Sequence, residues 1–147
     1  MSGFVYDAAV LVAADRNDRR AWAEHKARLE LGFVPLVPAP VVAQVSRSPR
    51  QVQLRRLLRG CFVVPLSERA AHEAGALLGS TRTSDVVDAV VVIVAAQTGS
   101  VILTGDSEDM KRLADAKGRE IVVVRVGCVA GIGGAIYRNV DGLLALI

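Results

Sequence analysis

The fold is decided by the stretch SDVVDAVVVIVAAQTGSVILTGD, residues 84–106. Its valines favour a strand, but the run from Asp85 to about residue 97 is longer than an ordinary strand. Ser84 as an N-cap, Asp85 in a first turn and Gly99 as a stop signal favour a buried helix. We therefore predict a helix over residues 85–97, followed by a strand over 101–104 that ends just before Asp106.

Segments on either side of this stretch alternate in the same way. Short apolar runs separated by amphipathic or capped segments predict a β-α-β-α-β-α-β-α-β order, and hence a mostly parallel sheet of about five strands flanked by helices. Ligands of such α/β folds bind outside the carboxyl ends of the strands. The predicted strands are 4–7, 33–37, 62–64, 101–104 and 121–126, and the predicted helices are 18–31, 41–45, 48–59, 67–78, 85–97 and 108–116, with one or two helical turns after Asp7 and a loop over 79–83.

Length and composition limit the class of protein. A chain of 147 residues with 52% hydrophobic content is expected to form one globular α/β domain over residues 1–126. Residues 127–147 are expected to be an appendage packed on the same domain. The apolar run from Val86 is not expected to span a membrane, because Asp88 lies inside it. No secretory signal is recognised, so we expect a cytoplasmic protein. The net charge of +3 decides little about partners.

Carboxylates occur at three places where an α/β fold binds ligands. Asp7 follows the first strand, Asp85 and Asp88 share one helix face, and Asp106 and Asp109 follow the fourth strand. Asp88 is the unusual residue, because an aspartate in an apolar run is costly unless it is paired, hydrogen-bonded or bound to a cation. The simpler interpretation is that Asp7 and Asp106 cap helices, Asp85 interacts with a helix dipole and Asp88 pairs with a distant arginine. For Asp85 and Asp109 alone, such a structural role is favoured. For Asp7, Asp88 and Asp106 together we favour a divalent metal site.

These motifs resemble the PIN-domain family from Phe4 to about Val126. Val-Tyr-Asp7-Ala-Ala-Val-Leu resembles the family's first acidic motif, Asp88-Ala its third, and Leu-Thr-Gly-Asp106 its fourth. The segment Pro-Ala-Pro-Val-Val-Ala-Gln44-Val resembles the second motif, except that the family usually has glutamate where this chain has Gln44. The resemblance extends to VapC-like toxin ribonucleases of type II toxin–antitoxin systems.

The resemblance implies a metal-dependent endoribonuclease that hydrolyses RNA with a Mg²⁺ or Mn²⁺ ion. Asp7, Asp88 and Asp106 would be the catalytic ligands, and Asp85 is expected to supply the charge that Gln44 lacks. Gln44, Thr104 and Asp109 are expected to lie just behind the ligands, where Thr104 would orient Asp106. The resemblance also implies a homodimer and a small antitoxin that masks the acids.

Basic residues near the acidic motifs are candidates for RNA binding. Arg47 and Arg50 follow Gln44, and Arg82 precedes the acidic helix, although all three also suit an ordinary solvated surface. A phosphatase of the haloacid-dehalogenase type is excluded because Ala9 stands where its second aspartate is needed. The serious alternative is a non-catalytic RNA- or protein-binding module with a degenerate acidic pocket, which Gln44 favours.

Overall fold

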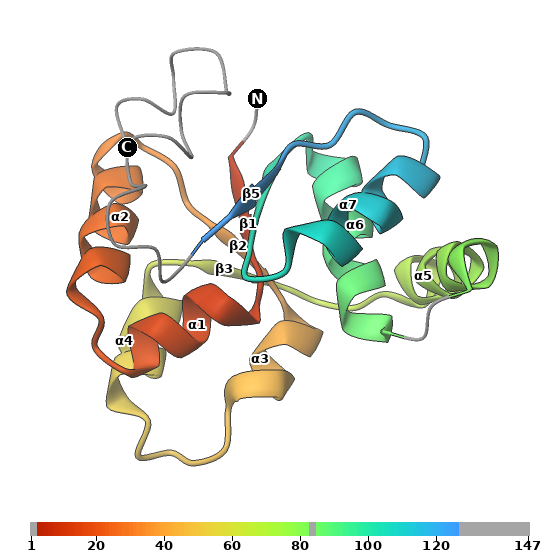
Figure 1. Cartoon of the computed structure of the whole chain (residues 1–147). Coiled ribbons are helices and arrows are strands. Elements are labelled where there is room, and N and C mark those ends of the chain that lie inside the picture. The colour runs from red at the N-terminus through yellow and green to blue at the C-terminus, as the bar shows by residue number, and fades with distance from the viewer. Residues whose placement is uncertain (1–2, 83–84, 127–147) are drawn as a thin grey trace.

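The computed structural model describes residues 3–82 and 85–126, and its centre is a five-stranded sheet in the order β3-β2-β1-β4-β5 (Figure 1). All four pairings between neighbouring strands are parallel. The predicted α/β class with a parallel sheet is therefore confirmed. The strands are β1 Phe4–Tyr6, β2 Leu36–Pro38, β3 Phe62–Val64, β4 Val101–Thr104 and β5 Val123–Arg125.

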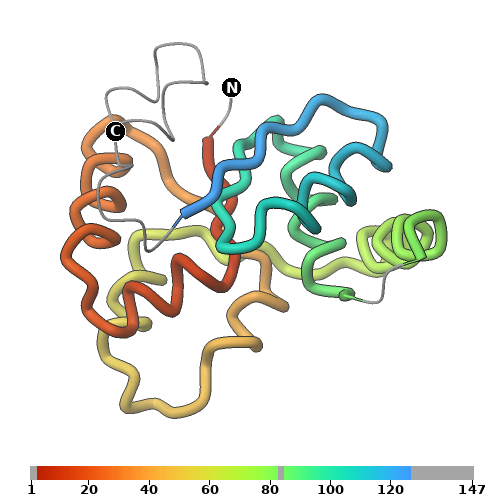
Figure 2. The backbone as a smooth tube through the Cα atoms, viewed as in Figure 1, coloured from red at the N-terminus to blue at the C-terminus, as the bar shows by residue number. Residues whose placement is uncertain are grey.

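Helices cover both sides of the sheet. In Figure 1, α1, α2 and α4 lie on one side and α5, α6 and α7 on the other. The backbone trace shows that β1 runs through the middle of the sheet beside the much later β4 (Figure 2). The helices are α1 Ala8–Asp15, α2 Arg19–Glu30, α3 Ala39–Val45, α4 Val52–Arg59, α5 Glu68–Thr81, α6 Val86–Thr98 and α7 Ser107–Ala116.

The helix predicted from the valine-rich stretch is confirmed as α6, although its N-cap is not the predicted one. Asp85, not Ser84, is the N-cap, and its side chain accepts a hydrogen bond from the Asp88 backbone amide at 3.0 Å. Gly99 ends the helix in the left-handed region at φ 64°. Residues 89–96 are all buried, because α6 packs against β1, β2 and β4 on one side and α5 and α7 on the other. This burial outweighs the strand propensity of valine.

Two predicted boundaries before β3 are wrong for local reasons. The strand predicted over 33–37 begins only at Leu36 and ends at Pro38, where α3 follows directly. The helix predicted from Ser48 begins at Val52 instead. The Gln51 side-chain oxygen accepts hydrogen bonds from the backbone amides of Arg47 and Ser48 at 2.6 and 2.9 Å, and so holds this segment as a turn.

Later boundaries differ by smaller amounts. Ser67 caps α5 as predicted, but the helix continues through Thr81 where a loop was predicted from residue 79. The hydroxyls of Ser80 and Thr81 donate to the Leu77 carbonyl, and Arg82 ends the helix at φ 55°. The helix predicted over 108–116 starts one residue earlier, and the strand predicted over 121–126 is confined to 123–125.

The core lies between the sheet and the two helical layers. The side chains of β1 and β4 are all buried, together with Leu11 of α1 and Ile93 of α6. None of the helices within 3–82 and 85–126 is long and apolar enough to cross a membrane. The appendage predicted over 127–147 lies outside the described residues.

Candidate metal centre

The site begins where β1 and β4 end side by side. Tyr6 and Leu103 are partners in the parallel register, and the Asp7 backbone amide donates to the Leu103 carbonyl at 2.9 Å. The residues that follow these strands therefore meet at one sheet edge. Asp7 arrives there from β1, and Thr104 and Asp106 arrive from β4, as predicted for the carboxyl ends of parallel strands.

The Asp7 carboxylate is buried, with a relative exposure of 7%. Asp7 occupies the N-cap position of α1, but its side chain makes no capping hydrogen bond. Instead, Oδ2 accepts a hydrogen bond of 2.8 Å from the Thr104 hydroxyl. Oδ1 is buried and forms no hydrogen bond of good geometry with the described residues, although the adjacent Ala8 backbone amide lowers the pKa of the carboxyl. The capping interpretation therefore does not account for this carboxylate.

Thr104 connects the two strand ends. It is fully buried, and its hydroxyl donates to Asp7 while its oxygen accepts from the Asp106 backbone amide at 3.1 Å. Both hydrogen-bonding roles of one hydroxyl are thus used at the site. Thr104 was predicted only to orient Asp106. Its hydroxyl oxygen accepts from the Asp106 backbone amide, and the same hydroxyl also holds the Asp7 carboxylate directly.

Asp106 and Asp109 lie at the start of α7. Asp106 is the N-cap, and its carboxylate accepts from the Asp109 amide at 3.4 Å, a long distance for a hydrogen bond. Asp106 is exposed, so burial does not restrict the rotation of its side chain. Asp109 is also exposed and forms a 3.6 Å ion pair with Arg112. It contributes negative charge near the site without facing a buried partner.

The pKa of Asp88 is strongly raised. Burial, together with the charges of Asp7, Asp85, Asp106 and Asp109, raises its pKa to about 7. Burial also raises the pKa of Asp7. The Thr104 hydroxyl and the Ala8 backbone amide oppose this effect, and the charges of Asp85 and Asp106 add to it. Neither residue has an ion-pair partner among residues 3–82 and 85–126. The acids from three elements therefore form one electrostatically coupled group.

This group has the chemistry of a site for a hard divalent cation, because carboxylate oxygens are the preferred ligands of such ions. Within the described ranges, no three histidine, cysteine, aspartate or glutamate side chains are already arranged to hold a metal ion. The fit depends on Asp7, whose buried Oδ1 forms no hydrogen bond of good geometry with the described residues.

The other predicted residues occupy the surface. Gln44 is exposed on α3, a helix that packs against α1 and α6. Arg47 donates to the carbonyls of Ala43 and Ser46, and so closes the C-terminal end of α3. Arg50 is exposed in the following turn, and Arg82 is exposed at the end of α5.

A buried polar network beside the site was not predicted. The Tyr6 hydroxyl lies 2.8 Å from His25 Nδ1 and accepts from Arg28 at 3.1 Å, while Arg28 pairs with Glu24 at 3.5 Å. Burial lowers the pKa of His25 to about 4, so the imidazole is neutral and its Nδ1 can accept a hydrogen bond from the Tyr6 hydroxyl. The only sequence signal was the spacing of His25 and Arg28 on one helix face, which does not reveal that the arginine is buried.

Comparison with known proteins identifies solved structures of similar fold. No protein-family model and no curated protein matches the sequence. A chain of VapBC2 from Rickettsia felis, solved bound to a DNA fragment from their promoter, has a TM-score of 0.63 at 14% identity, over 85% of this chain and 99% of that one. FitAcB from Neisseria gonorrhoeae has a TM-score of 0.54 at 13% identity, over 82% and 95% of the two chains.

A third similar structure is PAE2754 from Pyrobaculum aerophilum. It has a TM-score of 0.52 at 16% identity, over 80% of this chain and 98% of that chain. At such identities the likeness shows a shared, VapC-like fold, and activity has to be argued from the site itself.

Proposed function

We propose that this chain is a metal-dependent endoribonuclease and the toxin of a toxin–antitoxin pair. Asp7, Asp88 and Asp106 would hold a Mg²⁺ or Mn²⁺ ion. Two independent lines support the proposal: the VapC-like fold, and a coupled group of acids at the sheet edge where α/β proteins bind their ligands.

The observation that carries the proposal is the unsatisfied oxygen of Asp7. A buried carboxylate oxygen without a hydrogen-bond donor costs on the order of 1 to 3 kcal/mol, and burial raises the pKa of Asp7 in the metal-free chain. A divalent cation at Oδ1 would supply the missing positive partner. It would also favour the charged form of Asp88, which is disfavoured by burial and by four neighbouring carboxylates.

Two of the three proposed ligands, Asp7 and Asp106, differ in how firmly they are held. A bound divalent ion supplies a water of lowered pKa and an electrophile for a phosphodiester oxygen. Asp7 is the fixed ligand, because burial and the Thr104 hydrogen bond restrict its rotation. Asp106 is the mobile one, since its exposed side chain exchanges only a long capping bond for the ion.

Asp85 is proposed to supply the charge that Gln44 lacks. Its carboxylate caps α6, and its charge raises the pKa values of both Asp7 and Asp88. Asparagine caps helices about as well as aspartate, so Asp85→Asn removes the charge and keeps the cap. We expect weaker metal binding and slower cleavage. Unchanged values for both would show that Asp85 only caps the helix.

The direct test is RNA cleavage by the purified full chain with Mg²⁺ or Mn²⁺, compared with Asp7→Asn, Asp88→Asn and Asp106→Asn. We expect each substitution to lower the rate at least about 100-fold, because removing a group that stabilises a transition state typically costs 10²–10³ in rate. Asp115→Asn is the matched control, since Asp115 is an exposed aspartate on the same helix as Asp109. Equal activity in all five proteins would refute the proposal.

A non-catalytic binding module is the second candidate. The exposed Gln44 in place of an acid, and the absence of a preassembled metal cluster among the described residues, favour it. Such a module would bind metal or RNA but would not cleave RNA. The metal would still be bound at this site, because Asp7→Asn would abolish the binding. Gln44→Glu restores the acid. The variant should gain cleavage only if the site lost its activity when the glutamate was replaced, and not if the site works without that glutamate.

The proposal includes a homodimer, a small antitoxin that masks the acids, and action on RNA in the cytoplasm. Its partner component is tested by co-expressing the chain with a small protein encoded beside it and measuring cleavage by the purified complex. Full activity in a stable complex would exclude masking.

A further inference from the structure

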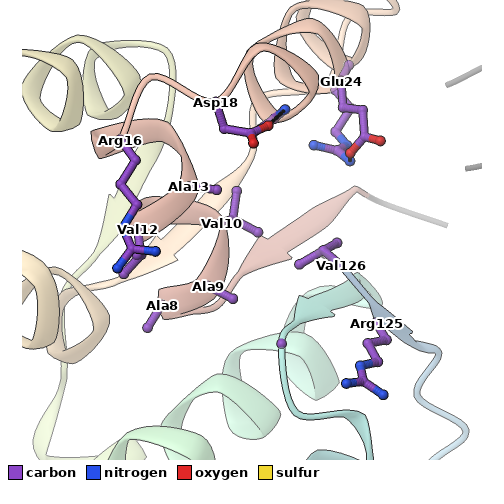
Figure 3. Close-up of a pocket in the computed structure, with 13 residues that line it drawn as sticks. Ala8, Ala9, Val10, Val12, Ala13, Arg16, Asp18, Glu24, Arg125 and Val126 are labelled. Atoms are coloured by element: carbon purple, nitrogen blue, oxygen red, sulfur yellow. Dashed lines mark hydrogen bonds and ion pairs between the residues drawn. The ribbon is translucent and has the colours of Figure 1, made fainter. Parts of the chain in front are cut away.

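A groove of about 540 Å³ opens beside the acidic site, between α1, α2 and the end of β5. Ala8 and Ala9, which line it, directly follow Asp7, and Gly105 directly precedes Asp106. The groove therefore starts at the two strand ends that carry these acids. Figure 3 shows Arg16 and Arg125 on opposite sides of the Ala8–Ala9 start of α1.

The floor of the groove is smooth and apolar. Alanines of α1, together with Val10, Val126 and Gly105, provide most of it, and none of the described residues that line it is aromatic. Gly105 is needed for the close approach of its loop to α1, because a Cβ there would lie 2.9 Å from the Ala9 Cβ. A floor of this kind accepts a sugar or a base edge by contact and offers little hydrogen-bond readout.

Three arginines line the groove, and two of them, Arg16 and Arg125, have no acidic partner among the described residues, whereas Arg28 is buried and pairs with Glu24. Arg16 follows the last residue of α1, and Arg125 pairs in register with Thr104, the residue that holds Asp7. Both are exposed, and neither has an acidic partner among residues 3–82 and 85–126. Arg16 and Arg125 are therefore available to bind an anionic ligand.

The acids that line the groove are already engaged. Asp18 caps α2 by accepting from the Ala21 amide at 2.8 Å. Glu24 pairs with Arg20 at 3.0 Å and with the buried Arg28 at 3.5 Å. Glu24 thus pairs with other arginines and Asp18 caps a helix, and neither carboxylate forms an ion pair with Arg16 or Arg125.

We propose that Arg16 and Arg125 bind backbone phosphates of a single-stranded RNA next to the phosphate at the acidic site. This inference rests on the proposed function, because it assigns the groove to the same substrate. Acids at one end of the groove repel the RNA backbone, and the two arginines fix its position, as phosphate contacts do. The lack of aromatic residues predicts positioning with little sequence preference.

The test measures binding of a fluorescent single-stranded RNA to the full chain carrying Asp7→Asn, which prevents cleavage. Arg16→Gln and Arg125→Gln are added singly and together, with Arg59→Gln as the matched control because Arg59 is exposed on α4 and also lacks an acidic partner among the described residues. Each lost phosphate contact should reduce the slope of log affinity against log salt by about 0.7. We expect the double variant to bind at least about 10-fold more weakly, with a slope smaller by about 1.4.

The outcomes separate this inference from the proposed function. If the double variant binds RNA more weakly but the unsubstituted chain cleaves no RNA, the groove is supported and the nuclease function is refuted. Cleavage by the parent with unchanged affinity and salt slope in the double variant would overturn the groove alone. If an oligoglutamate peptide, and not RNA, binds in an arginine-dependent way, the groove is a protein-docking surface and the inference is wrong.

Discussion

At the residue scale, Thr104 determines how Asp7 is held. A single buried hydroxyl fixes the carboxylate from β1 and the backbone from which Asp106 extends. Thr98, at the end of α6, bonds instead to its own helix and to Ser100, so the threonine type alone does not identify the role. The distinction comes from Asp7, which lies next to Thr104 only in the folded sheet.

Thr104→Val should weaken metal binding and cleavage about 10- to 100-fold, the usual effect of removing the hydrogen-bond partner of a metal ligand. Thr104→Ser keeps the hydroxyl and should stay close to the parent. Calorimetric titration with Mn²⁺ and a cleavage assay measure the two effects. Because valine has a similar shape, thermal unfolding serves as a check on packing. A valine variant with parental affinity would contradict the assigned role.

Asp88 should make the stability of the metal-free chain depend on pH. Its folded pKa of about 7 lies above the ordinary value of 3.8, so the folded state binds the proton more tightly than the unfolded state. The Asp88 contribution to stability is therefore complete below about pH 4 and is lost as pH rises toward about 7. Asp88→Asn removes this loss, so the variant should gain stability relative to the parent across that window.

The measurement is urea unfolding of both proteins in EDTA at several pH values. The difference between the two is needed because His25, whose pKa is lowered to about 4, contributes the opposite slope in both. Asp115→Asn should show a constant difference from the parent. A pH-independent difference for Asp88→Asn as well would mean that Asp88 titrates at its ordinary value.

At the element scale, the loop between β4 and α7 and the start of α1 must approach closely. An added Cβ at Gly105 would lie 2.9 Å from the Ala9 Cβ, a distance that real Cβ contacts essentially never show. Alanine is short and Ala9 is on a helix, so the backbone itself has to shift. That shift would separate the segments that carry Asp7 and Asp106.

Gly105→Ala should therefore lower cleavage at least about 10-fold, because misplacement of about 1 Å can cost on the order of 100-fold in rate. Adding Ala9→Gly removes the clashing atom and should restore most of the activity, although glycine in α1 costs about 1 kcal/mol of stability. Cleavage rates and melting temperatures of the single and double variants test this. A Gly105→Ala protein with parental activity, or a double variant without recovery, would contradict it.

At the scale of the whole molecule, the acidic group connects the centre of the sheet to two helices. Asp7 follows β1, Asp88 lies on α6 and Asp106 caps α7, so one ion at this point would link segments from both ends of the described chain. Such an ion binds the folded state and not the unfolded one, and so stabilises the fold as a whole.

Mn²⁺ should accordingly raise the melting temperature, by the equivalent of about 2.7 kcal/mol at a concentration 100 times the dissociation constant. EDTA should reverse the effect, and Asp7→Asn should abolish it while Asp115→Asn keeps it. Differential scanning calorimetry gives the shift for all three proteins. An equal shift in the Asp7→Asn protein would place the ion elsewhere.

The sequence by itself determined the class of the fold and the identity of the candidate acids. Alternation of capped and apolar segments is a local property, so the parallel α/β order, the strand over 62–64 and the helix at residues 86–98 could be predicted. Asp88 was recognisable because a charge in an apolar run needs a partner, whatever the fold. Boundaries were less predictable, as side chains such as Gln51 compete locally with helix formation.

Only the tertiary structure decided which oxygen of Asp7 lacks a hydrogen-bond partner among the described residues, that Thr104 faces that carboxylate, and that Arg16 and Arg125 flank one groove. These facts join residues far apart in the chain, and the strand register that joins them results from packing of the whole sheet. The same holds for Asp85, whose capping bond is local while its effect on Asp7 acts through space. Local patterns identify the groups that can do chemistry, and long-range contacts determine their environment.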